Sequence, residues 1–141
     1  NCENDLTGFY ADEDLDIAGS AVDGFAYGIK AALEGAGYTA DNWPLITGQD
    51  AEVMAVKNIV EGKQTQTIFK DTGLLAEKCV TMVQAVLEGS EPEINDTETY
   101  DNNKLVVPSY LCEPVSLDKD NYKELVIDSG YYTEDDINSA N

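Results

Sequence analysis

Charged and amide side chains directly follow three short apolar runs of the sequence, at residues 15–22, 44–47 and 66–69. They are Asp23, Gln49, Asp50, Lys70 and Asp71. If the apolar runs are parallel strands, their carboxyl ends share one edge of a sheet, where open α/β proteins bind their ligands. We therefore expect these side chains to surround one crevice. A carboxylate beside a lysine, without a nucleophile or a metal, is suited to recognising a polar ligand.

Two of these aspartates have an alternative structural explanation. Asp23 and Asp50 immediately precede helical stretches, and aspartate is a favoured N-cap residue that contributes about 1 kcal/mol. Capping is the favoured interpretation for Asp23. Asp50 could cap with one carboxylate oxygen and bind a ligand with the other. Gly48 would allow a ligand close to the backbone or would only serve a tight turn, and Lys70 could be an ordinary surface lysine.

Other site chemistries have little support in the sequence. The chain contains no histidine, which is the usual general base and the commonest metal ligand. The acidic stretches at 12–16 and 118–120 lack the glycine and the distal glutamate of a calcium loop. We expect no metal and no cofactor. An enzyme that uses Asp50 as a base and Lys70 as its electrostatic partner is the least favoured hypothesis.

The formal charge of −20, with only eight cationic side chains, argues against a nucleic-acid partner and against an anionic membrane surface. No apolar run approaches the roughly 20 residues of a membrane helix. The polar start at 1–5 is not a signal peptide, so we expect any export signal or anchor to lie upstream. Cys79 falls in an apolar helical pattern and is expected to be a buried thiol, and a Cys2–Cys112 bridge is possible.

Strand and helix patterns alternate three times, which predicts βαβ units with a parallel sheet. Helical spacing follows each apolar run, at 25–36, 53–60 and 75–86. An acidic loop is expected at 91–103, followed by short strands at 104–107 and 124–127. Three βα units make a thin sheet, so the chain is interpreted as part of something larger.

Several stretches together resemble a known family. WPLITGQDAEVMAVKNIVEGKQTQTIFKDT at 43–72 is similar to the C-terminal part of periplasmic sugar-binding proteins, in particular the multiple-sugar and xylose-binding receptors of bacterial ABC importers. VDGFAYGIKAALEGAGY, LAEKCVTMVQAVLEG, VVPSYLCEPVSLDKDNY and DSGYYTEDDI extend the likeness over nearly the whole chain.

The resemblance implies an incomplete type I periplasmic-binding-protein (Venus flytrap) fold, an α/β lobe built of βαβ units. Residues 1–70 would form βα units of the C-terminal lobe, and 71–107 a helix and loop packed on the N-terminal lobe. Residues 108–141 would be a return segment and C-terminal tail on the C-terminal lobe. The N-terminal lobe of the same protein would be missing. The receptor would be non-enzymatic, periplasmic or a cell-surface lipoprotein, and would deliver a monosaccharide (pentose or hexose) to permease subunits.

The resemblance also implies roles for individual residues. Asp50 would accept hydrogen bonds from sugar hydroxyls, and Lys70 would donate to sugar oxygens, with Gln49 and Asp23 beside them. Val22 is a departure, because xylose receptors carry a sugar-contacting asparagine there. The arginines expected of such sites would come from the absent lobe. A similar lobe serves as the effector domain of sugar-responsive transcription regulators, which is the alternative function.

Overall fold

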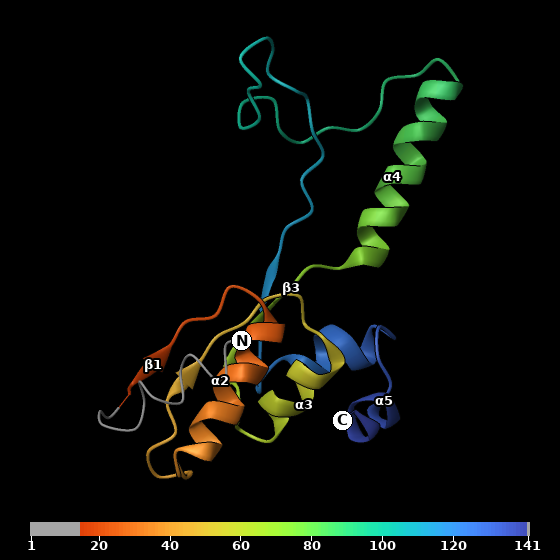
Figure 1. The fold of residues 1–141 in the computed structure, drawn as a ribbon. Coiled ribbons are helices and arrows are strands. Elements are labelled where there is room, and N and C mark those ends of the chain that lie inside the picture. The colour runs from red at the N-terminus through yellow and green to blue at the C-terminus, as the bar shows by residue number, and fades with distance from the viewer. Residues whose placement is uncertain (1–14, 141) are drawn as a thin grey trace. The chain divides into compact units, whose positions relative to one another are not determined.

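The computed structural model describes residues 15–140, and strands alternate with helices along its first half (Figure 1). The elements in chain order are β1 (Ile17–Ala18), α2 (Asp23–Gly35), β2 (Leu45–Ile46), α3 (Val53–Val60), β3 (Gln66–Phe69), α4 (Thr72–Leu87), β4 (Val115–Asp118), the π-helix η1 (Lys123–Asp128) and α5 (Glu134–Ser139).

The described chain divides into two compact units. The first contains the described residues up to Phe69 together with those from Val115 onward, and the second is Lys70–Pro114. The segment boundaries predicted from the sequence follow residues 70 and 107. What the second unit packs against in a longer protein stays a prediction.

The first unit contains two short two-stranded sheets. β1 and β2 are parallel, with Ile17 opposite Leu45, and β3 and β4 are antiparallel, with Gln66 opposite Asp118. Backbone hydrogen bonds also connect the β2 segment to the β3 segment in a parallel course: Thr65 N donates to Ile46 O at 2.8 Å. The predicted βαβ organisation of an incomplete α/β lobe is therefore confirmed.

The first two strands are shorter than predicted because side chains replace backbone partners beside them. Thr47 Oγ1 accepts from Ser20 N at 3.1 Å, and Thr65 Oγ1 accepts from Ile46 N at 3.0 Å. These hydroxyl contacts interrupt the backbone ladder around the two-residue strands β1 and β2.

Two strand predictions in the second half are wrong. The run at 124–127 lies inside the π-helix η1, with Val126 buried, and the run at 104–107 contributes only an isolated bridge between Asp101 and Val106. Short apolar runs do not distinguish strand from helix by periodicity. The strand that does form, β4, buries only Leu117 and has no strong apolar alternation.

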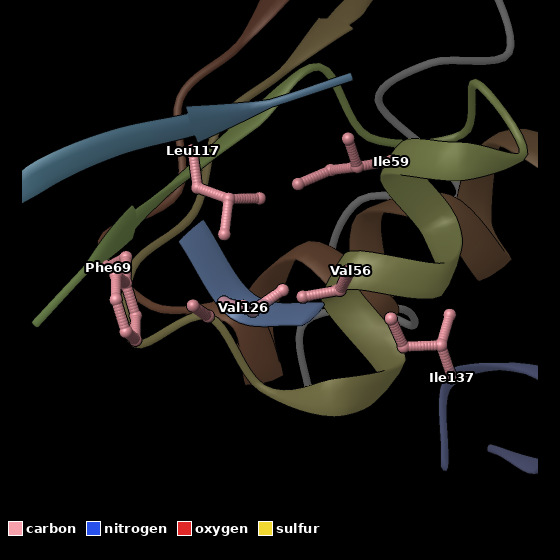
Figure 2. Close-up of a cluster of buried hydrophobic side chains, with 7 residues drawn as sticks. Val56, Ile59, Phe69, Leu117, Val126 and Ile137 are labelled. Carbon is pink, nitrogen blue, oxygen red and sulfur yellow. The ribbon is translucent and has the colours of Figure 1, made fainter. Parts of the chain in front are cut away.

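Two apolar clusters form the core of the first unit. One gathers around α3, where Val56 and Ile59 belong to a buried cluster with residues of β3, β4, η1 and α5 (Figure 2). The other packs α2 against β1 and β2 through Ala18, Ala26, Ile29, Leu33 and Ile46. Helical spacing in the sequence predicted apolar faces for both helices, and burial confirms most of each face. Phe25, which the same spacing placed on the α2 face, is 57% exposed.

The second unit contains α4, whose apolar residues are exposed. Asp71 caps this helix by accepting from Gly73 N at 2.8 Å and from Leu74 N at 3.0 Å. No residue of α4 is buried within the described chain, and Val83 is 54% exposed. Cys79 is likewise an exposed free thiol, so its predicted burial is wrong in this arrangement. Cys112 is free as well, and Cys2 lies outside the described residues.

Candidate functional site

The turn between β2 and α3, residues 48–52, has an unusual backbone. Asp50 and Ala51 both have positive φ angles, 100° and 50°, although neither is glycine. Such conformations are unfavourable for residues with a Cβ, and they persist where surrounding contacts over-determine them. α3 begins at Val53, and its N-cap residue is Glu52, which makes no side-chain cap hydrogen bond. Asp50 therefore does not cap α3.

Hydrogen bonds hold this turn from three sides. Asp50 N donates to Ile68 O at 2.9 Å, which attaches the turn to β3. Ala51 N donates to Thr67 Oγ1 at 3.2 Å, and Ala51 O accepts from the Tyr132 hydroxyl at 3.1 Å. The turn is thus fixed by groups that are remote in the sequence.

Asp23 supplies the contacts from the α2 side. Its backbone N donates to Gln49 O at 2.9 Å, and its Oδ2 accepts from Glu52 N at 3.0 Å. The same carboxylate accepts from Gln64 Nε2 at 2.9 Å and from Thr67 Oγ1 at 2.8 Å. It therefore spans both ends of the turn.

The Asp23 side chain is fully buried, with 0% exposure. Burial raises the pKa of this carboxyl, while hydrogen bonds from Gln64, from the Glu52 backbone and from Thr67 act in the opposite direction. The N-cap of α2 is Val22, so the capping interpretation of Asp23 is wrong. Its carboxylate points into the protein, and a direct ligand contact would require the turn to open.

Packing explains why position 48 is a glycine, and the sequence did not reveal this. A Cβ at this position would overlap Asp23 Oδ1 and lie 2.5 Å from Gln64 Nε2. The absent side chain leaves the space that the buried carboxylate and its amide partner occupy. Of the two interpretations considered for Gly48, the tight local geometry is the one that these contacts support.

The other predicted site residues differ in exposure. Asp50 is exposed and Gln49 is partly buried, and both lie in the turn. Lys70 is exposed and follows β3, at the start of the second unit. Within that unit it lines a pocket of about 470 Å³ whose other residues include Asp71, Leu75, Tyr100, Tyr110 and Cys112.

The sequence predicted that Asp23, Gln49 and Asp50 lie at one edge, and the hydrogen bond from Asp23 N to Gln49 O attaches Asp23 to the turn that contains the other two. The sequence did not identify the residues that lie behind the turn. Thr67 is buried with 0% exposure in an otherwise unremarkable strand, and a hydroxyl at an inward strand position was its only signal. Nothing in the sequence pointed to Tyr132, which reaches the turn from 81 residues away.

Tyr27 adds a polar contact beside the turn. Its hydroxyl donates to Glu52 Oε2 at 2.8 Å. Burial and the neighbouring carboxylate of Glu52 raise the pKa of Tyr27, so this phenol stays protonated and remains a donor. Residues 15–140 contain no group of three or more side chains arranged to hold a metal ion. No helix among them has the length and apolar character needed to cross a membrane.

Comparison with known proteins places this geometry in context. A family model described as periplasmic binding protein domain matches residues 1–91. The multiple sugar-binding periplasmic receptor ChvE of Rhizobium radiobacter is 46% identical over 96% of this chain and 39% of its own length. The multiple sugar-binding periplasmic protein SbpA of Azospirillum brasilense is 49% identical over 94% of this chain and 37% of its own length.

Solved structures agree with these sequence matches. An ABC transporter solute binding protein from Clostridium phytofermentans, with bound β-D-glucose, superposes with a TM-score of 0.79 at 45% identity. The match covers 96% of this chain and 43% of that structure. The chain thus spans about two fifths of the length of the relatives it matches. By its family match and its fold, this chain belongs to the periplasmic binding protein family.

Proposed function

We propose that this chain is the sugar-recognising part of an extracytoplasmic solute-binding protein of an ABC importer. The complete protein would bind a monosaccharide between two lobes and deliver it to the membrane permease, without chemical conversion. The observation that carries the proposal is the strained turn 48–52, which presents exposed Asp50 in a chain 45% identical to a glucose-bound solute binding protein.

In this proposal Asp50 is the main acceptor for the sugar. A carboxylate can accept from two adjacent hydroxyl groups, and hydrogen bonds to a charged group contribute about 1.5–3 kcal/mol each. Lys70 would donate to sugar oxygens, and Gln49 would add a polar contact. A direct sugar contact by Asp23 stays a prediction, and its observed contacts favour a supporting role.

The second unit has a separate place in the proposal. The apolar residues of α4 would pack on the N-terminal lobe of the same protein, which is not part of this chain. Two observations support this packing. No residue of α4 is buried within the described chain, and the matched relatives are more than twice as long as this chain. The exposed large apolar residues of that helix are Leu74, Leu75, Val80, Val83, Val86 and Leu87.

The names of the relatives support the expected compartment and ligand class. The two sequence relatives are named as periplasmic sugar-binding proteins, and the Clostridium structure holds glucose. We therefore propose a location outside the cytoplasmic membrane, either periplasmic or anchored as a lipoprotein. Closure on the sugar would shift an equilibrium between open and closed forms, and the permease would recognise the closed form.

Calorimetry on the full-length protein tests the proposal, with D-glucose as the first probe and D-xylose as the second. Asp50→Ala is expected to weaken binding more than tenfold, which is about 1.4 kcal/mol. Asp41→Ala is the matched control, because Asp41 is an exposed loop aspartate away from the turn. Unchanged affinity in the Asp50 variant would reject this role, and absence of binding to every monosaccharide tried would reject the function.

A further inference from the structure

We infer that Asp23 and Thr67 are positioning residues that hold the turn 48–52 in the left-handed backbone conformation presenting Asp50. The consequence for sugar affinity rests on the function proposed for Asp50. The consequence for the conformation of the turn rests only on the contacts around it.

The turn needs such support because two consecutive non-glycine residues adopt positive φ angles. Asp50 has φ 100° and Ala51 has φ 50°. Aspartate tolerates this region better than most residues, whereas alanine has no polar side chain to compensate. The isolated segment would therefore favour other conformations, and outside contacts must select the observed one.

The Thr67 hydroxyl contacts Ala51, one of the two residues with a positive φ angle. It donates to Asp23 at 2.8 Å from Oδ1 and 3.0 Å from Oδ2, and it accepts from Ala51 N at 3.2 Å. A hydroxyl has a single hydrogen to donate and lone pairs to accept. Because the carboxylate takes the hydrogen, a lone pair of Thr67 is left to face the Ala51 amide.

Asp23 holds the turn on both sides of Asp50. Its backbone N donates to Gln49 O at 2.9 Å, and its Oδ2 accepts from Glu52 N at 3.0 Å. Its side chain and that of Thr67 are both 0% exposed, so water does not compete for these hydrogen bonds. Gly48 leaves room for this carboxylate, since an added Cβ would overlap Oδ1.

A purely structural role for the pair makes a different prediction. If the pair only stabilised the core, losing the hydroxyl would lower the melting temperature, while the folded protein would keep its turn and its affinity. A positioning role requires the turn itself to loosen in the folded protein. The two roles are therefore separated by readouts on folded protein.

The test compares three variants of the full-length protein. Thr67→Val keeps the shape of the side chain and removes the hydroxyl, and Thr67→Ser keeps the hydroxyl. Leu33→Ala creates a cavity in the separate α2 cluster, where Leu33 is 0% exposed, and so serves as the control for lost stability. Amide hydrogen exchange at residues 50–52 is measured relative to amides inside α3, and D-glucose affinity is measured by calorimetry.

Thr67→Val is expected to speed relative exchange in the turn and to weaken glucose binding, each by about fivefold, which corresponds to one lost hydrogen bond. Thr67→Ser should restore both values to within about twofold of the unmodified protein. Leu33→Ala should lower the melting temperature and change neither value. If Thr67→Val does not fold, Asp23→Asn tests the positioning role by the same measurements. The N–H₂ group of the asparagine would face groups that now donate to the carboxylate, such as Gln64 Nε2 and Glu52 N.

Unchanged relative exchange at residues 50–52 in the folded variant would overturn the inference. So would an equal change in the Leu33 control. If Asp50→Ala leaves glucose affinity intact while Thr67→Val loosens the turn, the function proposed for Asp50 is wrong and the positioning role is supported. If Asp50→Ala weakens binding while Thr67→Val changes nothing, the positioning role is wrong and the proposed function is supported.

Discussion

The hydroxyl of Tyr132 donates a hydrogen bond to the backbone carbonyl of Ala51 at 3.1 Å, across 81 residues of sequence. This contact attaches the C-terminal segment to the strained turn. Aromatic packing supports the same segment: the Tyr131 ring meets Phe69 edge-on at 4.9 Å and Tyr132 at 5.0 Å between centroids. The two tyrosines after the π-helix are therefore part of what shapes the candidate site.

Tyr132→Phe should lower the free energy of unfolding by about 1 kcal/mol, because one hydrogen bond is lost while the ring is kept. Urea denaturation followed by circular dichroism measures the change. Tyr100→Phe is the control, since Tyr100 is 53% exposed in the other unit, and its effect should stay within about 0.5 kcal/mol. Equal losses in the two variants would show that the Tyr132 hydroxyl contributes nothing specific.

Two glycine-to-alanine substitutions should act with opposite signs. Gly48→Ala forces a Cβ onto the Asp23 carboxylate and should destabilise the protein by about 1–3 kcal/mol. Gly24→Ala, in the first turn of α2, meets nothing within 4 Å and should stabilise by about 0.4–1 kcal/mol. Thermal denaturation of both variants checks the prediction, and a tolerated alanine at 48 would contradict the packing around Asp23.

The buried Asp23 carboxyl should also make stability depend on pH in a defined direction. Burial raises its pKa in the folded protein above the ordinary value of 3.8, with Glu52 adding a like charge nearby. The folded state then binds the proton more tightly than the unfolded state. The resulting stabilisation is fully present below pH 3.8 and is lost as pH rises through the folded pKa.

Asp23→Asn isolates this contribution, because asparagine does not titrate. The stability of the unmodified protein minus that of the variant should fall as pH rises from 3.8 and become constant above the folded pKa. Denaturant unfolding at a series of pH values gives both curves. A difference that increases with pH would mean that the hydrogen bonds from Gln64, Thr67 and Glu52 outweigh burial.

Val83→Glu tests whether the apolar face of α4 is covered in the complete protein. Val83 is 54% exposed here, so in this chain alone the substitution should change stability by no more than about 0.5 kcal/mol. In the full-length protein, where we propose that a second lobe covers α4, the buried charge should destabilise by several kcal/mol. Melting temperatures of both forms give the comparison.

Thr81→Glu is the matched control on the polar side of the same helix. Thr81 is exposed, and its side chain donates only within its own helix, to Lys78 O at 3.0 Å. Thr81→Glu should leave the melting temperature nearly unchanged in both forms of the protein. Equal tolerance of Val83→Glu in the full-length protein would mean that α4 stays exposed there.

The sequence by itself determined where α2 and α3 lie and most of the apolar residues that they bury. Ile29 and Leu33 in α2, and Val56 and Ile59 in α3, repeat at helical spacing and are all buried. Periodicity suffices there because a helix of several turns repeats its signal. The sequence also predicted a ligand-binding role for the turn at the carboxyl end of β2, from its charge, its position and the family resemblance, and this role stays a prediction.

Only the tertiary structure decided what supports that turn. Asp23 reads in the sequence as a cap or a ligand contact, yet it is a buried acceptor for Gln64 and Thr67, which lie 41 and 44 residues away. The short apolar run around Val126 forms a π-helix, a conformation that its own pattern does not distinguish from a strand. Local patterns report which face of an element is buried. The partners of a polar side chain depend on contacts between distant segments, which exist only once the chain has folded.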